Sequence, residues 1–281
     1  MNLTTELAGK VAVVTGGGAG LGAALARVFA RQGAAVATLD IDGVAAEQTA
    51  KTITEELGVP TTSARVDVGD GESLAVAARH VRETLGGCDV LCANVGVQQF
   101  GAIDRLTDQD WEWVLNVNVL GTIRTVREFL PLIRERAGWR RIVLTASSSV
   151  LTPAVRMGAY QTSKFAVTGF GETLREELAP EGIGVTLLFP GGMATGHLES
   201  SVQARPAALG TTSVDMDDLA AMLAHRPVGE ADVVTPEHAI RNLLTDLRDD
   251  EPYSVTHGSF RPFYVARRDA MDAALNRMEA S

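Results

Sequence analysis

The segment GAYQTSKFAV, residues 158–167, places a tyrosine and a lysine four positions apart. Lysine occurs only at Lys10, Lys51 and Lys164, although arginine is common. On a helix, positions i and i+4 lie about 5–6 Å apart on one face. At an effective dielectric near 20, an ammonium at that distance stabilises a phenolate by about 3 kcal/mol, or about two pKa units. We therefore expect Lys164 to lower the pKa of Tyr160 toward neutrality, as general acid–base catalysis requires. The alternative is an exposed tyrosine beside a solvated lysine.

A serine-rich segment, ASSSV at residues 146–150, comes before this pair and closes an expected strand. The carboxyl ends of strands in an open parallel sheet face a ligand crevice. A serine at that place can donate a hydrogen bond to a substrate oxygen while hydride moves. For two of the three serines, a simpler role in satisfying loop backbone groups is expected.

A glycine-rich segment, TGGGAGLG at residues 15–22, follows the first expected strand and opens a helix. Gly16, Gly20 and Gly22 allow a tight turn and close approach of a pyrophosphate to backbone amides, and the helix N-terminus adds partial positive charge. The alternative is a plain strand-to-helix turn. The strand before, the helix after and an acid at the end of the second strand favour a dinucleotide site.

That acid is Asp40. A carboxylate there can accept both hydroxyls of an adenosine ribose and would repel a 2′-phosphate. The glycine-rich segment contains no Lys or Arg, and none closely follows Asp40. NAD is therefore favoured over NADP. Asp40 or Asp42 could instead cap the next helix. Asp67 is placed to meet the adenine edge, and it too could be a helix cap.

Apolar runs of strand length alternate with stretches of helical period along the chain. This alternation predicts an α/β fold, a doubly wound parallel sheet (Rossmann fold) of about seven strands with helices on both faces. We expect one domain over residues 1–281, with a substrate-loop insertion at about 196–235 and a C-terminal tail at about 258–281. The expected strands are 10–15, 35–40, 61–68, 89–93, 141–146, 185–189 and 253–257. The expected helices are 21–31, 44–57, 72–85, 108–136, 160–178 and a stretch after Pro262.

Composition excludes several classes of protein. With 281 residues and 46% hydrophobic content, the chain can bury a large core. A formal net charge of -10 argues against binding to nucleic acid or to an anionic membrane surface. No apolar run approaches the ~20 residues of a membrane span, and the N-terminus shows no basic leader. We therefore expect a cytoplasmic protein.

Cysteine and histidine usage points away from structural bridges and metal sites. Cys88 and Cys92 are too few for a disulfide framework and are expected to be buried thiols. The five histidines show no ligand spacing, so no metal site is predicted.

Together these motifs resemble the short-chain dehydrogenase/reductase family, in its compact subtype. The resemblance spans residues 8 to 260 and adds ANVG at 93–96, NVNVLG at 116–121 and PGGMAT at 190–195 to the segments above. It implies a catalytic set of Ser147, Tyr160, Lys164 and Asn118, with Ser148 and Asn116 as fallbacks. Asn118 would hold a water that links the lysine to solvent. The cofactor-binding positions implied are Gly16, Gly18, Gly20, Leu21, Gly22, Asp40, Ile41, Asp67, Val68, Asn94, Gly96, Tyr160, Lys164, Pro190, Gly191, Met193 and Thr195.

One position departs from the family pattern. The usual NNAG is ANVG here, with Ala93 and Val95 at variant positions. This removes one side-chain amide near the fourth strand and puts its local hydrogen bonding in question. The four catalytic residues are unaffected.

The resulting hypothesis is reversible hydride transfer between NAD and a secondary alcohol or its ketone. The residues expected near the pocket are mostly apolar and favour a bulky lipophilic substrate, either alicyclic, aryl or steroid-like. They are Val97, Phe100, Ser149, Leu151, Val155 and Met157, with Met193, Leu198, Val202, Leu209, Met216 and Met222 from the insertion. The same side chains could instead be loop core. Arg156 and Arg205 could capture a carboxylate, although both are expected to face solvent.

Two rival functions fit the same fold. One is an NAD-binding regulator or scaffold with little turnover, and the other is an epimerase or dehydratase on a related longer scaffold. The presence of the tyrosine, the lysine and the serine argues against the first, and the chain length and glycine spacing argue against the second. Relatives suggest a homotetramer or homodimer.

Overall fold

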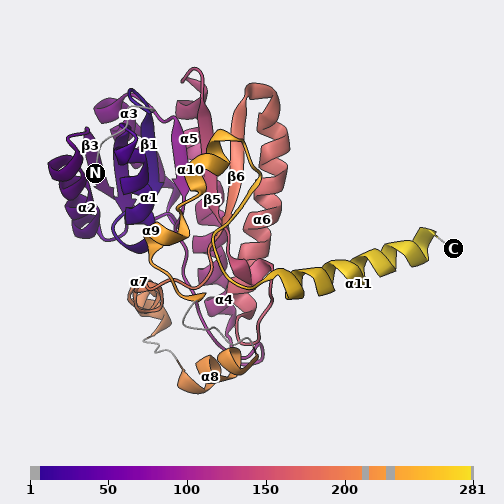
Figure 1. Cartoon of the computed structure of the whole chain (residues 1–281). Coiled ribbons are helices and arrows are strands. Elements are labelled where there is room, and N and C mark those ends of the chain that lie inside the picture. Colours follow the sequence, from indigo (N-terminus) through magenta and orange to yellow (C-terminus); the bar gives the residue numbers. More distant parts are fainter. Residues whose placement is uncertain (1–6, 211–214, 226–231, 280–281) are drawn as a thin grey trace.

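Seven parallel strands form one sheet in the order β3-β2-β1-β4-β5-β6-β7 (Figure 1). The computed structural model describes residues 7–210, 215–225 and 232–279. Every neighbouring pair of strands is parallel, which confirms the predicted fold class. The strands are β1 (Val11–Thr15), β2 (Ala35–Asp40), β3 (Thr61–Arg65), β4 (Val90–Ala93), β5 (Arg140–Thr145), β6 (Ile183–Phe189) and β7 (Tyr253–Val255).

Helices cover both faces of this sheet because side chains along each strand alternate between the faces. In β1, Val11 and Val13 join one apolar core, whereas Ala12 and Val14 join the other. The first core is closed by α3 (Gly71–Leu85), α5 (Gly121–Arg134) and α6 (Gly158–Leu178). The second is closed by α1 (Gly20–Arg31), α2 (Gly43–Leu57) and α10 (Leu243–Arg248), with Ile240 after the short α9 (Pro236–Ala239).

The strand order reverses between β1 and β4. In open α/β sheets, ligands bind outside the carboxyl ends of the strands at such a reversal. The crevice therefore lies where β1 ends at Thr15 and β4 ends at Ala93. The glycine-rich segment and the ANVG segment follow these two strand ends directly.

The long helical region expected at 108–136 is not one regular helix. It consists of α4 (Asp108–Leu115), a π-helical turn (Asn116–Leu120) and α5. Thr107 begins α4 with a capping box in which it exchanges hydrogen bonds with Asp110. A π-helical turn inserts one residue into the helical period and is frequent at functional sites. Here it contains the predicted catalytic asparagine.

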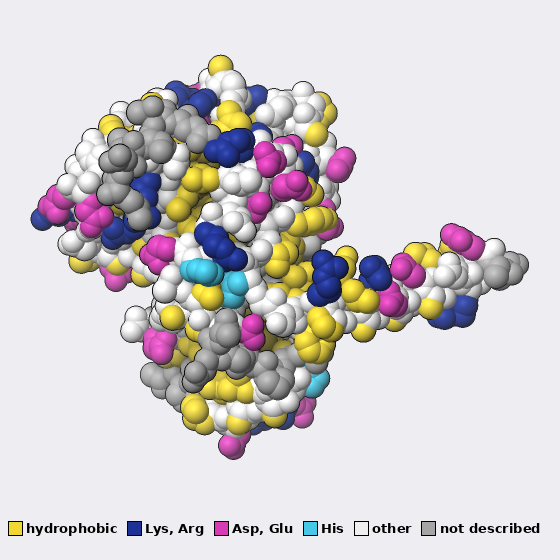
Figure 2. Space-filling view, in the orientation of Figure 1, with side chains coloured by type: hydrophobic (Ala, Val, Ile, Leu, Met, Phe, Trp, Pro, Cys, Tyr) yellow, Lys and Arg dark blue, Asp and Glu magenta, His cyan; other side chains and the backbone are white. Residues whose placement is uncertain are grey.

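The insertion and the tail form separate helices. The described parts of the insertion contain α7 (His197–Ala204) and α8 (Met216–His225), while residues 211–214 and 226–231 lie outside the described range. The tail forms α11 (Arg261–Glu279), which projects from the body in Figure 1 and carries hydrophobic side chains along its surface in Figure 2. None of its residues is buried. Its Arg267 donates to the carbonyl of Val150 and lies over the ring of Phe165.

Cys88 and Cys92 are free and buried, as predicted. No described helix combines the length and the apolar character needed to cross a membrane.

Asp89, the residue before β4, fixes the end of the sheet that lies opposite the crevice. Its buried carboxylate accepts from the backbone amide of Val11 at 2.9 Å, from Lys10 at 3.0 Å and from Arg136 at 2.9 Å. One side chain thus joins β1, β4 and the segment after α5.

We expect Asp89→Ala to lower the free energy of unfolding by about 3 kcal/mol, because it leaves two partly buried cations and an amide without their acceptor. Urea unfolding followed by circular dichroism measures this change. The control is Glu55→Ala, which removes an exposed pair with Lys51 and should cost less than about 0.5 kcal/mol. Equal effects of both substitutions would contradict the central position of Asp89.

Candidate active site

Tyr160 and Lys164 lie in the first two turns of α6, and both side chains are buried. Lys164 Nζ donates to the carbonyl of Thr145, the last residue of β5, at 2.8 Å. The same Nζ lies 5.6 Å from the centroid of the Tyr160 ring. A Cβ added at Gly96 would come within 3.1 Å of it. The ammonium therefore sits between α6, the end of β5 and the loop after β4.

The expected direction of the Tyr160 pKa is wrong for this structure. Burial raises the pKa of Tyr160, and a hydrogen bond with Ser147 opposes this only in part. Burial also lowers the pKa of Lys164 to about 8. Desolvation disfavours the charged form of each group and is the largest cause of both shifts, whereas the expected direction holds for a partly solvated pair. Lys164 also lies over the ring of Tyr160 and binds a backbone carbonyl.

Ser147 is the serine that meets Tyr160. Its side chain lies near the phenol, where it acts to lower the pKa of Tyr160, and it accepts from the backbone amide of Ser149 at 3.1 Å. Ser148 instead donates its backbone amide to the carbonyl of Pro190 at 2.9 Å. The geometry favours Ser147 over Ser148 as the residue beside the reacting oxygen.

The π-helical turn directs Asn118 inward. Its side chain accepts from the amide of Val97 at 2.7 Å and donates to the carbonyl of Val97 at 2.9 Å and to Ser163 at 2.9 Å. Asn116 is turned elsewhere, because its oxygen accepts from Arg124 at 2.8 Å. Asn118 thus holds the loop after β4 against α6, directly beside Gly96.

The glycine-rich turn has the shape of a phosphate cradle. Gly16 and Gly20 have φ angles of 67° and 51°, a region that favours glycine. A Cβ at Gly22 would stand 1.8 Å from the carbonyl oxygen of Gly16, so only glycine lets the helix approach the turn. Ala19 provides no side-chain cap to α1, which leaves the first amides of this helix for an anion.

Asp40 lies beneath this turn and does not cap a helix. Its carboxylate accepts from the amides of Gly18 at 2.9 Å and Asp42 at 3.0 Å, whereas Asp42 is the residue that caps α2. Each oxygen of Asp40 keeps a lone pair for a further donor. Sequence reasoning missed one neighbour, Arg65 at the end of β3, whose exposed side chain donates to the carbonyl of Ile41 at 3.1 Å.

The remaining predicted cofactor positions differ in what their side chains do. Asp67 is exposed and accepts from the amide of Gly69 at 2.8 Å, while Asp70 caps α3. Leu21 and Val68 are buried in the two cores, so only their backbones are available to a ligand. Ile41 is 43% exposed.

Asn94 resolves the question raised by the ANVG segment. It donates from its side chain to the carbonyl of Thr15 at 3.2 Å and accepts from Thr145 at 3.1 Å. Its amide therefore joins the ends of β1, β4 and β5 without a second asparagine.

The segment Pro190–Thr195 closes the other side of the crevice. The amide of Gly191 donates to Thr256 at 3.1 Å, and His257 bonds the carbonyl of Gly192 at 2.6 Å. The methyl and Cβ of Thr195 lie within 3.5–3.6 Å of the place where a Cβ of Gly20 would be. Met193 packs against the core beneath α1. This arrangement brings Thr195 over the glycine-rich turn.

Two arginines that could have captured a carboxylate are already paired. Arg205 binds Asp110 at 2.6 Å, with both side chains only 10% exposed, and it lies over the Trp113 ring. Burial alone would raise the pKa of Asp110, but hydrogen bonds from Thr107 and Arg205 outweigh it and lower that pKa. The expectation that Arg205 faces solvent was wrong. Its partner is distant in sequence, so spacing gave no signal.

Arg156 also has an acidic partner. It lies 3.1 Å from the buried carboxylate of Asp218 on α8, which Arg105 also binds. These contacts connect α8 to the loop before α4, which contains Arg105, and to the loop before α6, which contains Arg156. In the same way, the pair of Arg205 with Asp110 connects the end of α7 to α4.

Sequence reasoning also missed His197, the first residue of α7. Its ring packs edge-on against Tyr160 with centroids 6.3 Å apart. Burial and then the charge of Lys164 lower the pKa of His197 to about 4. The only signal in the sequence was a histidine two residues after Thr195.

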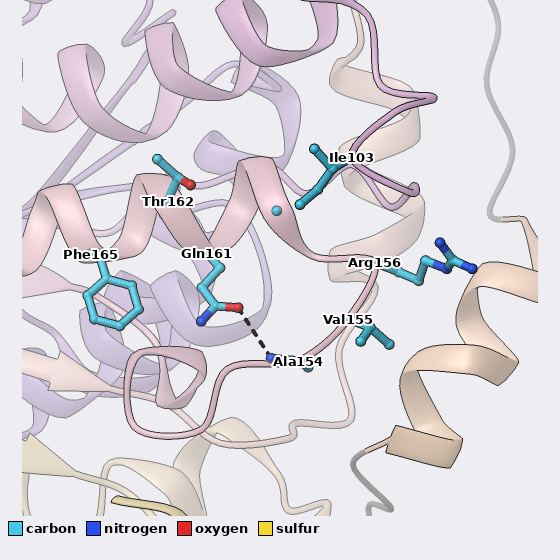
Figure 3. Close-up of a pocket in the computed structure, with 8 residues that line it drawn as sticks. Ile103, Ala154, Val155, Arg156, Gln161, Thr162 and Phe165 are labelled. Atoms are coloured by element: carbon cyan, nitrogen blue, oxygen red, sulfur yellow. Dashed lines mark hydrogen bonds between the residues drawn. The ribbon is translucent and has the colours of Figure 1, made fainter. Parts of the chain in front are cut away.

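The expected apolar lining is divided between core and surface. Val97 and Leu209 belong to an apolar cluster with Trp113, Val114 and Ala159. Met216 is 69% exposed. Val155 lines a groove shown in Figure 3, together with Ile103, Ala154, Arg156, Gly158, Gln161, Thr162 and Phe165. This groove uses a different face of α6 from Tyr160 and Lys164, so it is separate from the catalytic side chains.

Comparison with known proteins shows the family to which the chain belongs. Residues 10–206 match the short chain dehydrogenase family. The chain is 31% identical over 204 residues to C alpha-dehydrogenase from Sphingobium sp., covering 72% of this chain and 66% of that protein. It is 36% identical over 197 residues to momilactone A synthase from Oryza sativa subsp. japonica, covering 68% and 69% of the two chains.

A solved structure is similar over nearly the whole chain. A short chain dehydrogenase/reductase from Burkholderia phymatum, in complex with NAD, superposes with a TM-score of 0.86 at 29% identity and covers 96% of both chains. The sheet, the crevice and these matches define a Rossmann-type oxidoreductase. This chain belongs to the short chain dehydrogenase family.

The low pKa of His197 has a consequence for stability. Because that pKa is about 4 in the folded state against 6.5 ordinarily, the unfolded chain binds more protons between these values. The stability contributed by neutral His197 is therefore full above about pH 6.5 and is lost as pH falls toward 4.

As pH falls from about 6.5 to 4, we expect the unfolding free energy of the wild type to fall more steeply than that of His197→Gln. The extra loss should be on the order of 2 kcal/mol, after discounting for the half-buried ring. Urea unfolding at several pH values measures it. The exposed His238, substituted by Gln, is the control and should follow the wild type. Parallel curves for the wild type and His197→Gln would mean that the ring is not desolvated.

Proposed function

We propose that this oxidoreductase transfers a hydride reversibly between NAD and a secondary alcohol or its ketone. The observation that carries the proposal is the convergence of Ser147, Tyr160 and Lys164 at the carboxyl end of β5. Ser147 lies near the phenol and acts to lower the pKa of Tyr160, and Lys164 Nζ lies over the phenol ring, 5.6 Å from its centroid. A regulator or scaffold without turnover has no need of such a buried cation, whose desolvation is costly.

Each side chain has a separate task in this proposal. Tyr160 exchanges a proton with the substrate oxygen, and Ser147 donates a hydrogen bond to the same oxygen. Lys164 supplies positive charge close to the phenol, and Asn118 positions the loop that encloses Lys164. Burial keeps Tyr160 protonated near neutral pH, which suits it to act as the acid in ketone reduction.

The residues around the crevice suit a dinucleotide. The uncapped start of α1 and the positive-φ glycines offer backbone amides for a pyrophosphate. Asp40 would accept the hydroxyls of the adenosine ribose, Asp67 would face the adenine, and the Pro190–Thr195 segment would hold the carboxamide end. Bound NAD would accept or supply the hydride. The related Burkholderia structure, which contains NAD, supports this choice.

The substrate we propose is lipophilic and bulky. Val97 and Leu209 belong to an apolar cluster between the loop after β4, α4 and α6. Arg205 is held by Asp110 in a largely buried pair, and Arg156 lies 3.1 Å from the carboxylate of Asp218, so each arginine already has an acidic partner. A neutral alicyclic, aryl or steroid-like ketone therefore fits better than a hydroxy acid.

The proposal also covers the domain organisation, the cellular compartment and the assembly of the protein. We propose a single catalytic domain over residues 1–281, acting in the cytoplasm as a homodimer or homotetramer. Support for assembly comes from β7, an edge strand whose Tyr253 and Val255 are each 49% exposed.

Tyr160→Phe tests the reaction. We expect turnover of a good ketone substrate to fall by about 10³-fold, because the proton donor is lost, while NADH binding stays within about threefold. Steady-state kinetics and NADH fluorescence measure the two quantities. The control is Tyr264→Phe on the projecting helix α11, which should retain full turnover. Near-normal turnover by Tyr160→Phe would overturn the assignment.

Asp40→Ser tests the cofactor choice. We expect the ratio of kcat/KM for NAD over NADP to fall by at least about 10²-fold, since a repelling carboxylate is removed and Arg65 remains to pair with a 2′-phosphate. Adding Arg65→Ala to this variant should abolish most of the gain with NADP. A wild-type preference for NADP would contradict our interpretation of Asp40.

A further inference from the structure

A buried hydrogen-bonding atom without a partner lies beside the catalytic tyrosine. Within the described part of the chain, Nε2 of His197 is buried and has no hydrogen-bond partner. The ring of the same residue contacts the ring of Tyr160 edge-on, with centroids 6.3 Å apart. Buried polar atoms are nearly always paired, so an unpaired one in a folded protein needs an explanation. Leaving it unsatisfied is unfavourable, because the desolvation of the atom is not repaid.

The position of His197 is fixed by the fold. It begins α7, directly after the Pro190–Thr195 segment that closes the crevice. Ser201, one turn further along α7, accepts from the amide of Gln98 at 3.0 Å and donates to the carbonyl of His197 at 2.7 Å. The pair between Arg205 and Asp110 fastens the end of the same helix. The imidazole is therefore held in place by contacts that do not use its own nitrogens.

We propose that His197 is a specificity-determining residue whose Nε2 binds a second, neutral hydrogen-bonding group of the substrate, close to the reacting carbonyl. The substrate class is then a lipophilic ketone or alcohol with a neighbouring hydroxyl, carbonyl or ether oxygen. This inference rests on the proposed function, because Tyr160 must meet the reacting oxygen for His197 to meet the second one.

The charge of the second group follows from the surroundings of the ring. His197 is neutral at physiological pH, since burial and Lys164 both disfavour its protonation. A neutral imidazole can donate or accept one hydrogen bond at Nε2 according to its tautomer, but it offers no charge to a carboxylate. The two nearby arginines already have acidic partners. An anionic group at this position would therefore lose its hydration and gain no charged partner from His197.

The experiment compares two ketones that differ by one hydroxyl, acetophenone and phenacyl alcohol, with benzoylformate as the anionic analogue. Three variants are used. His197→Phe keeps a flat ring against Tyr160 but has no polar atom, His197→Gln restores a terminal amide, and the exposed His238→Phe is the matched control. NADH oxidation gives kcat/KM, and calorimetric titration of the enzyme–NAD complex, which cannot reduce the ketone, gives ketone affinity.

We expect the wild type to prefer phenacyl alcohol over acetophenone by about tenfold or more and to discriminate against benzoylformate. His197→Phe should remove most of that preference, with a loss about tenfold larger for phenacyl alcohol than for acetophenone. His197→Gln should recover part of it, and His238→Phe should match the wild type.

Other outcomes overturn the proposal. Equal losses for both ketones in His197→Phe would mean that the ring only supports Tyr160. A matching fall in NADH affinity would assign Nε2 to the cofactor. If the wild type reduced phenacyl alcohol and acetophenone equally well, the role of His197 would be refuted and the proposed function would stand. The wild type could instead bind phenacyl alcohol more tightly than acetophenone, lose this preference in His197→Phe, and reduce neither ketone. That result would support the binding role of His197 and refute the proposed reaction.

Discussion

A buried ammonium group is the constraint on which the rest of the site depends. Removing Lys164 from water disfavours its charge, as its lowered pKa of about 8 shows. The carbonyl of Thr145 compensates part of that cost, because a charge-assisted hydrogen bond is stronger than a neutral one. To hold the cation there, the end of β5, the loop after β4 and the start of α6 must meet at one point. Gly96 gives the room, since a side chain would crowd Nζ.

The π-helical turn follows from the same requirement. A regular helix through 108–136 would orient Asn116 and Asn118 with the ordinary period of 3.6 residues. The extra residue in the turn lets Asn118 bond both backbone groups of Val97 and the side chain of Ser163. Asn116 is then left to pair with Arg124 outside the site. The asparagine therefore stabilises the enclosure of Lys164 by fixing its walls.

Local spacing in the sequence predicted most of the fold and much of the site. The apolar runs of strand length, the glycine-rich turn and the Tyr160–Lys164 interval are short-range patterns, and each has a counterpart in the structure. What spacing missed depends on residues far apart in the chain. The pairs of Arg205 with Asp110 and of Arg156 with Asp218, and the contact of His197 with Tyr160, all join distant segments. The direction of the Tyr160 pKa was wrong for a related reason, since burial is a property of the whole fold.

Recognition of the ribose and the geometry of the phosphate turn are coupled through one carboxylate. Asp40 accepts from the amide of Gly18 within the glycine-rich turn and from the amide of Asp42 before α2. A side chain at Gly18 would stand 2.9 Å from the same carboxylate. Asp40 therefore fixes the backbone of the glycine-rich turn beside the start of α1. Its remaining lone pairs stay available to a further donor. Because a single group performs both tasks, its loss would alter the shape of the phosphate cradle as well as the choice between ribose and its 2′-phosphate. Arg65 donates to the carbonyl of Ile41 and makes no contact with the glycine-rich turn in this bond. Its loss would therefore change the choice between ribose and its 2′-phosphate without changing the shape of the phosphate cradle.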